Sequence, residues 1–287
     1  MNGVRCLFSI NEDEVQFQYM SNHSRISDYC RYFALRQRVY LVNMSEERNR
    51  DVYESLSGTV TASGQDELEL LMVHGGHGVK VGQGGVVTYK LTSEALGSGI
   101  QVLADLIDVS AENVFRFRMH GTLELFQRRM DSRALLTVPI FHLCRSLPLD
   151  HFRREWQRVI DYQKQSTVLP GLTLVKTEID LSAGGAGLLC KPEKKPTPLS
   201  MFFIGLEEHG GPICALAETV WEKQDTEGVR CGFRFIQILK ADQERIDKQV
   251  TDVIRRDGGT PLGYKRNWVL MDKMVSDQSP PLGTKGN

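Results

Sequence analysis

DLSAGGAGLL at residues 180–189 and GVRCGFRFIQI at residues 228–238 are the stretches that decide the fold. In the second stretch, apolar side chains at every other position alternate with Arg230, Gly232 and Arg234. A period of two is typical of a β-strand with one buried and one solvated face. Both stretches therefore predict strands in the wall of a small barrel or sandwich.

Further short strand-like runs surround these two stretches. They lie at residues 133–144, 171–181, 186–190, 199–206, 213–221 and 229–238. After the last run, residues 241–256 carry apolar side chains at a helical spacing, and Gly258 gives a C-terminal stop. We therefore expect a barrel that ends in one amphipathic helix.

The segment 146–165 does not fit a simple barrel. Its apolar side chains, Leu149, Phe152, Trp156 and Ile160, lie on one helical face, which predicts an inserted helix. Trp156 and Trp221 are both interpreted as core or domain-contact aromatics.

A separate set of glycine-punctuated strands precedes this unit, at residues 56–62, 67–73, 86–91, 99–107 and 112–119. Strands at this spacing indicate a second small barrel, and residues 29–40 show a weak helical pattern. We therefore expect a mainly β fold with two small β-barrel domains. The expected segments are an N-terminal extension (1–50), a first barrel (51–122), a linker (123–133), a second barrel (134–258) and a tail (259–287).

Composition limits the possible functions. The formal net charge of −1 argues against a bulk nucleic-acid binder. No apolar run is long enough to span a bilayer, and acidic residues occupy the place where a signal peptide would be apolar. The six cysteines are scattered without a CxxC pair, which argues against a zinc site or a disulfide framework. We expect a cytoplasmic protein that is not an enzyme, with no metal and no cofactor, because no paired-carboxylate, Ser-His-Asp or Cys-His arrangement stands out.

Two polar clusters stand out. The first is an RxxxR pattern formed by Arg129 and Arg133, with Arg128 directly before it. The second is a [D/N]xSxxG pattern between two strands, formed by Asp180, Ser182, Gly184 and Gly185. Each pattern alone is common, as an exposed charged helix or as a turn.

In this order, with the GFRFI strand and the final helix, the clusters resemble the PilZ domain, a bacterial receptor module for cyclic di-GMP. The resemblance covers about residues 126–256. The earlier strands resemble the N-terminal barrel of YcgR-type flagellar-brake proteins. The resemblance implies cyclic di-GMP as the ligand, held by Arg128, Arg129, Arg133, Asp180, Ser182, Gly184 and Gly185, and it implies that Arg128 favours a ligand dimer.

This ligand chemistry suits the residue types. Arginine forks two donors onto a phosphate, stacks on a base or donates to the guanine O6/N7 edge. Asp180 can accept from guanine N1–H and N2–H₂, and a glycine at 185 allows close backbone approach.

The inserted helix carries a second RRxxxR, formed by Arg153, Arg154 and Arg158. This motif is nearer to Asp180 in the sequence. We favour Arg129 and Arg133, because they precede an apolar strand at the domain junction.

The expected function is a receptor whose interdomain arrangement changes on ligand binding, to regulate motility, surface attachment or polysaccharide output. Its protein partner is unidentified; flagellar motor and secretion or polysaccharide machinery are the candidates that the resemblance suggests. The alternative is a PilZ-fold interaction module that does not bind nucleotide.

Overall fold

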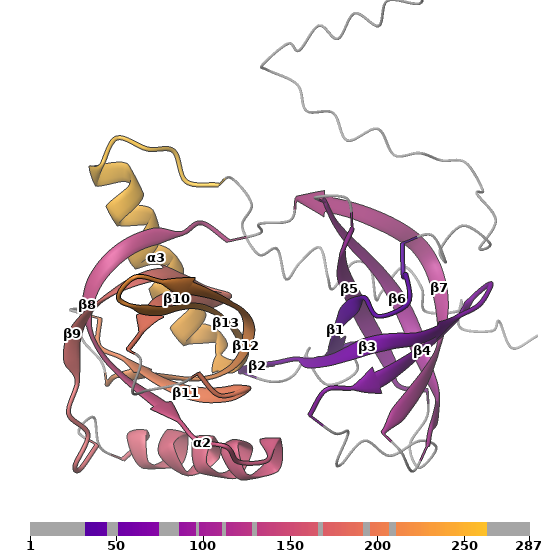
Figure 1. The fold of residues 1–287 in the computed structure, drawn as a ribbon, viewed down its shortest axis with the longest axis horizontal. Coiled ribbons are helices and arrows are strands. Elements are labelled where there is room, and N and C mark those ends of the chain that lie inside the picture. The colour runs from indigo at the N-terminus through magenta and orange to yellow at the C-terminus, as the bar shows by residue number, and fades with distance from the viewer. Residues whose placement is uncertain are drawn as a thin grey trace, which may run out of the picture.

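The computed structural model describes residues 32–44, 51–74, 86–95, 98–110, 113–127, 131–165, 169–191, 196–206 and 211–262. These residues form two closed six-stranded β-barrels that lie side by side (Figure 1). The expectation of a mainly β fold with two barrels is confirmed.

The first barrel has the strand order β1-β3-β4-β7-β6-β5 and closes through the β1–β5 pair. Its core contains Leu41, Leu68, Phe115 and other fully buried side chains. The strands are β1 (Arg38–Asn43), β3 (Leu56–Ser63), β4 (Glu67–Met72), β5 (Thr88–Ala95), β6 (Ser98–Val109) and β7 (Val114–Gln127). Strand β1 lies within the expected N-terminal extension, and the weak helix expected over 29–40 was wrong where that segment is described.

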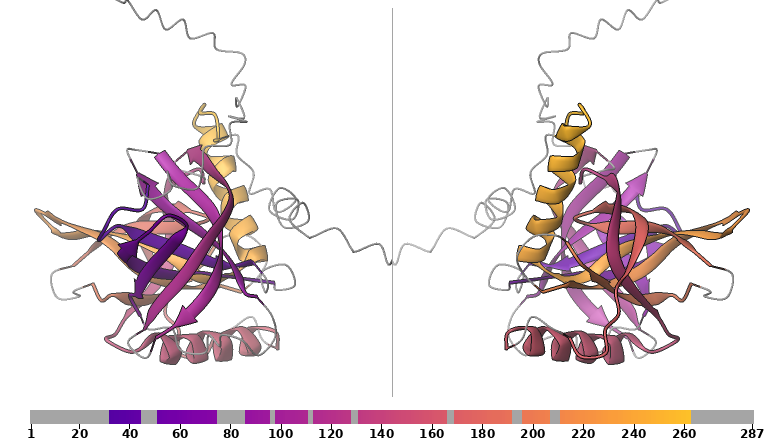
Figure 2. Two further views of the ribbon diagram at one scale, coloured as in Figure 1. Left: turned by 90° about the vertical axis from the view of Figure 1, so that its right-hand side faces the viewer. Right: turned by 90° about the vertical axis from the view of Figure 1, so that its left-hand side faces the viewer.

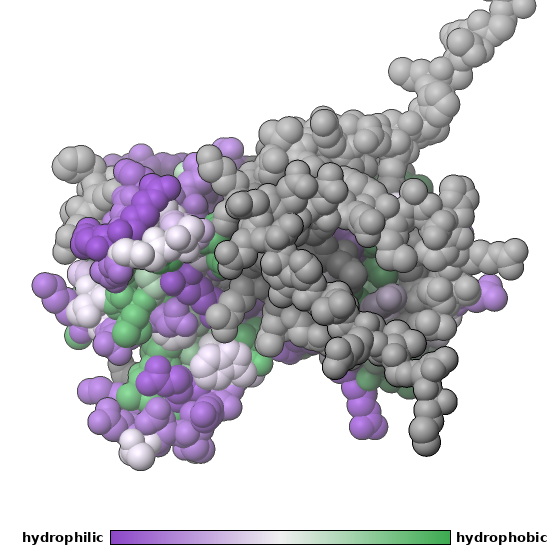
Figure 3. Space-filling model, turned by 90° about the horizontal axis from the view of Figure 1, so that it is seen from above, coloured by the Kyte–Doolittle hydropathy of each residue, from purple (hydrophilic) through white to green (hydrophobic). Residues whose placement is uncertain are grey.

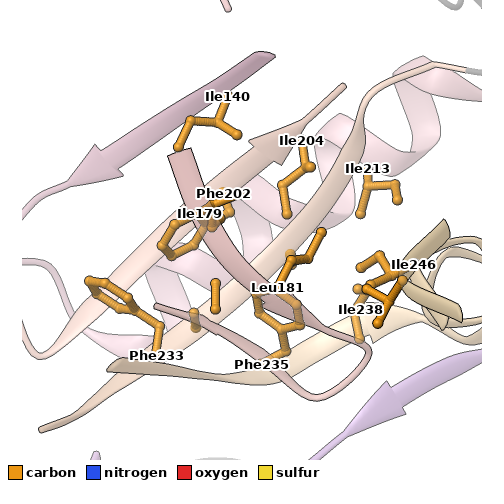
Figure 4. Packing of buried hydrophobic residues seen from close by; sticks show 14 of the residues in the cluster. Ile140, Ile179, Leu181, Phe202, Ile204, Ile213, Phe233, Phe235, Ile238 and Ile246 are labelled. Carbon is orange, nitrogen blue, oxygen red and sulfur yellow. The ribbon is translucent and has the colours of Figure 1, made fainter. Parts of the chain in front are cut away.

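The second barrel has the ring order β10-β9-β8-β11-β12-β13 and closes through the β10–β13 pair. Cys231, Phe233 and Phe235 of β13 point into its core, as the alternation predicted (Figure 4). The strands are β8 (Ala134–Cys144), β9 (Val175–Ser182), β10 (Gly185–Cys190), β11 (Leu199–Ile204), β12 (Ile213–Asp225) and β13 (Gly228–Leu239).

Two helices cover the second barrel at different places (Figure 2). Helix α2 (Leu149–Gln163) buries the four apolar residues named from the sequence, and they pack with side chains of β11 and β12. The Trp156 indole N–H donates to the Cys214 carbonyl at 2.9 Å. Helix α3 (Lys240–Arg256) inserts Ile246 and Val250 into the barrel core. Each large apolar side chain buried in this way stabilises the fold by about 1.5–3 kcal/mol, and both predicted helices are confirmed.

Strand β2 (Val52–Glu54) was not expected. It precedes the first barrel's β3 in the chain but pairs with β13 of the second barrel. Two further backbone hydrogen bonds flank it, from Ser55 N–H to the Ile236 carbonyl and from Lys240 N–H to the Asp51 carbonyl, each 2.8 Å. Between β1 and β3 the chain therefore contributes one strand to the sheet of the second barrel. The remaining strands of that sheet all follow β7 in the chain.

No helix within the described ranges is long and apolar enough to cross a membrane.

Candidate functional site

The turn that connects β9 to β10 carries the second sequence cluster. The Ser182 hydroxyl donates to the Gly185 carbonyl at 3.2 Å, and the Phe235 N–H of β13 donates to the Gly184 carbonyl at 2.9 Å. The Gln243 side chain of α3 donates to the Ala183 carbonyl at 3.0 Å. Strand β13 and helix α3 therefore fix this turn from both sides.

Gly185 is a glycine for a steric reason. A Cβ at this position would lie 2.2 Å from the Phe233 carbonyl oxygen. This oxygen belongs to the backbone of the neighbouring strand and cannot move without shifting that strand. Gly184 is half-buried and Ser182 is buried, with its hydroxyl directed to the turn itself. Contact of Ser182, Gly184 and Gly185 with a ligand stays a prediction, and the described geometry gives Ser182 and Gly185 a role in shaping the turn.

Asp180 and Arg133 come together in space although residues 134–179 separate them in the chain. Arg133 Nη1 lies 3.8 Å from Asp180 Oδ2, and both side chains are 45% exposed. The contact arises because Ala134, next to Arg133, pairs with Leu181, next to Asp180, in the β8–β9 ladder. Because both side chains are exposed, both groups are accessible to an external ligand. An exposed ion pair of this kind adds little stability.

Arg128 and Arg129 lie outside the described residues, so their part in the site stays a prediction. The linker is described again from Asp131. The Ser132 hydroxyl accepts a 2.8 Å hydrogen bond from the backbone N–H of Leu262, which follows α3. The residue directly before Arg133 is thus bonded to the segment that follows α3.

Asp180 belongs to a row of residues that crosses four strand pairs on the outer wall of the barrel. The register pairs Asp180 with Leu135 on one side and with Gly187 on the other. Gly187 in turn pairs with Gly232, and Gly232 pairs with Trp221. Gly187 leaves a lane without a side chain between the Asp180 carboxylate and the Trp221 indole, which lies over Gly232. We call these five residues the outer row.

Trp221 was expected in a core or at a domain contact. That prediction was right for Trp156, which is fully buried, and wrong for Trp221, which is 45% exposed. A register shift between Thr219 and Trp221 re-aims the strand, and the indole lies over Gly232. Apolar surface also appears between hydrophilic side chains on the second barrel seen from above (Figure 3).

The second RRxxxR lies on another wall of the barrel. Helix α2 packs on β11 and β12, which stand opposite β10 and β9 in the six-stranded ring. Arg158 contacts Glu155 of its own helix at 2.6 Å, and Arg153 reaches Glu54 of β2 at 2.5 Å. This placement supports the preference for Arg133 over Arg154 and Arg158.

The three buried thiols of the second barrel are unsuited to nucleophilic chemistry. Burial raises the pKa of Cys190, Cys214 and Cys231, so these groups stay protonated near neutral pH. No group of three or more potential metal ligands occurs in the part of the chain that the structure describes.

Comparison with known proteins gives one family match. Residues 152–252 match the family model described as the PilZ domain. The match includes Asp180 to Gly185 and the strands of the outer row other than β8, and it begins at residue 152, after the linker arginines. A search of curated proteins found no match.

Among solved structures, the chain is similar to the inhibitor of motility MotI/DgrA of Bacillus subtilis, with 15% identity over 78% of this chain and 97% of that one, at a TM-score of 0.31. It is also similar to YcgR of Escherichia coli in complex with c-di-GMP, with 15% identity over 77% and 85% of the two chains and a TM-score of 0.27. The MrkH–c-di-GMP complex of K. pneumonia gives 17% identity over 78% and 89%, with a TM-score of 0.28.

Proposed function

We propose that this chain is a receptor for cyclic di-GMP and not an enzyme, because residues 152–252 match the PilZ-domain family model. PilZ domains bind this cyclic dinucleotide as a ligand. The observation that supports the proposal is the outer row, where an exposed Arg133–Asp180 pair borders the lane at Gly187, and the lane ends at the exposed Trp221 indole.

Each part of this surface suits one part of the ligand. The Arg133 guanidinium, with Arg128 and Arg129 of the same linker, can donate in pairs to the phosphodiesters or to guanine O6 and N7. The Asp180 carboxylate can accept from guanine N1–H and N2–H₂. Gly187 would let a flat base approach the backbone, and the Trp221 indole, which covers Gly232, offers an aromatic face for stacking.

The linker also suits a role in signalling. Arg133 follows directly on the segment that leaves the first barrel, so a ligand that engages Arg128, Arg129 and Arg133 acts on the connection between the barrels. We propose that ligand binding favours one arrangement of the barrels by its differential affinity. The regulated output would be motility, surface attachment or polysaccharide production, through an unidentified cytoplasmic protein partner.

Calorimetric titration of the full chain with cyclic di-GMP tests the proposal. Saturable binding that is lost in Asp180→Ala and reduced in Arg133→Ala would support it, and the stoichiometry would distinguish one bound ligand from a dimer. Absence of heat at micromolar concentrations, with cyclic di-AMP and GMP as controls, would favour a PilZ-fold interaction module that does not bind nucleotide.

A further inference from the structure

A second row of residues runs beside the outer row and leads from the β9–β10 turn to the first barrel. Ser182 pairs with Gly185, Gly185 pairs with Arg234, and Arg234 pairs with Glu218. The turn that carries the second motif and the carboxylate of Glu218 thus lie at the two ends of one line of cross-strand neighbours. Arg234 stands between them.

Glu218 is a buried charge, with its side chain only 2% exposed. Arg38 Nη2 of β1 lies 2.9 Å from Glu218 Oε1, and His74 Nε2, which follows β4, lies 3.7 Å from the same oxygen. Burial raises the pKa of Glu218, but His74, Arg38 and Ser57 together outweigh burial and bring the pKa below its ordinary value. These three groups, which lower the pKa of this carboxyl group, all belong to the first barrel.

Arg234 makes a second contact across the same boundary. Its guanidinium carbon lies 3.7 Å from the centroid of the Tyr40 ring of β1, the geometry of a cation–π contact. Tyr53 of β2 and Glu218 add to the stability of its positive charge. Strand β13 is therefore fixed to the first barrel at the residue that faces the ligand turn.

The boundary between the barrels is polar at this point. A small cavity, with room for about one water molecule, is lined by Ser55, Ser57, His74 and Glu218 together with three apolar side chains. Among the described residues, the two serine hydroxyls and both Glu218 carboxylate oxygens lack a well-aligned hydrogen bond. Contacts between domains that move are more polar than permanent ones, whereas a boundary meant to stay closed would be apolar.

We infer that Arg38, Tyr40, His74, Glu218 and Arg234 form an interbarrel lock, and that Arg234 couples this lock to the ligand turn. The inference rests on the proposed function for its ligand, but the lock itself does not depend on any ligand. With the lock closed, β13 is held against Tyr40 and the β9–β10 turn is packed on β13, so the closed arrangement is the one with high ligand affinity. Opening the lock separates Glu218 from Arg38 and His74 and loosens the turn.

Hydrogen exchange in the ligand-free full chain tests the lock. Arg38→Met removes the cation and leaves Glu218 charged in the boundary, which is more costly than the loss of both partners. We expect faster exchange in residues 51–57 and 213–219, with unchanged protection in the cores of both barrels. Arg116→Met is the matched control, because Arg116 pairs with Glu69 on the exposed face of β7, opposite β1 in the first barrel.

A double variant keeps this test informative if a single change disturbs folding. Arg38→Met combined with Glu218→Gln removes both charges, so its exchange in 51–57 should lie closer to wild type than that of Arg38→Met alone. Exchange in Arg38→Met that equals the Arg116→Met control would overturn the lock. The lock would also be overturned if the increase in exchange of residues 51–57 in the double variant equalled the sum of the increases in Arg38→Met and Glu218→Gln.

Titration with cyclic di-GMP tests the coupling. Arg38→Met should bind about tenfold more weakly than wild type, within the range of roughly 5–150-fold typical of coupled sites, and ligand should slow exchange in residues 51–57 of the wild type by reciprocity. Unchanged affinity in a variant whose lock has opened would overturn the coupling and leave the lock standing. If wild type binds no cyclic di-GMP, the proposed function fails, and the exchange experiment still decides the lock.

Discussion

The indole of Trp221 lies directly on Gly232. A Cβ at position 232 would come within 2.1 Å of the indole Nε1 and 2.2 Å of Cε2. The indole belongs to β12 and the glycine to β13. Only a glycine at position 232 leaves room for the ring over the strand. Gly232 also pairs with Gly187. A side chain at position 232 would therefore displace the indole that borders the lane at Gly187.

We therefore expect Gly232→Ala to displace the indole and to weaken cyclic di-GMP binding by about tenfold, the loss of roughly one stacking contact. Calorimetry measures the affinity, and circular dichroism in the near ultraviolet reports the displaced indole. Gly64→Ala, in the β3–β4 turn where the nearest atom is 3.9 Å away, is the control. Normal affinity in Gly232→Ala with a displaced indole would remove Trp221 from the ligand surface.

Gly185→Ala should destabilise the second barrel whether or not a ligand binds. The added Cβ would meet the Phe233 carbonyl at 2.2 Å, and relief requires β10 to move away from β13. Overpacking of this kind costs about 1–3 kcal/mol, which lowers the unfolding midpoint by about 3–10 °C. Calorimetric melting beside Gly64→Ala measures the effect, and an unchanged midpoint would mean that the turn is not packed as described.

Arginine substitutions should separate the two RRxxxR clusters. Arg129→Ala and Arg133→Ala each remove a charged donor, so each should weaken cyclic di-GMP binding severalfold to about a hundredfold. Arg154→Ala should leave the affinity unchanged, because α2 covers the wall opposite Asp180. Titration of the three variants gives the answer, and a reversed pattern would move the site to α2.

The stability of the boundary between the barrels should depend on pH through Glu218. Its pKa is lower in the folded protein than in the unfolded chain, so the unfolded state binds the proton more readily. The stabilisation is then complete above the ordinary glutamate pKa of about 4.3 and is lost as the pH falls through the lower folded value. Arg38, His74 and Arg234 face the carboxylate.

Thermal unfolding of wild type and Glu218→Gln between pH 7 and pH 3 measures this contribution. The difference between their midpoints should shrink as the pH falls, because a protonated glutamate resembles glutamine. A difference that stays constant over the whole range would show that the charge of Glu218 does not stabilise the boundary. Glu69→Gln serves as the matched control on the exposed face of the first barrel.

Much of the fold could be predicted from local patterns. The period of two in β13 and the helical spacing of Leu149, Phe152 and Trp156 are written in neighbouring residues, and both were confirmed. Strand β1 was missed because its first residues fall within the weak helical pattern over residues 29–40, and no turn signal separates the two. Trp221 was misplaced because its exposure depends on a bulge in β12 and on a glycine in the next strand.

The candidate site divides in the same way. The types of residue that suit a cyclic dinucleotide, Arg133 and Asp180 above all, could be named from the motif, and the β8–β9 register then brings them to 3.8 Å. Gly187, Gly232 and Trp221 carried no signal in the sequence, since a glycine or a tryptophan alone does not say which strand will lie beside it.

The order of residues along the chain by itself determined which segments become strands and helices, since side-chain alternation and backbone preference act between near neighbours. Only the tertiary structure decided that β2 pairs with β13, and that Glu218 meets Arg38 of the other barrel. Such pairings are set by the burial of whole sheets and by the charge that each buried group must meet, and these are properties of the assembled fold.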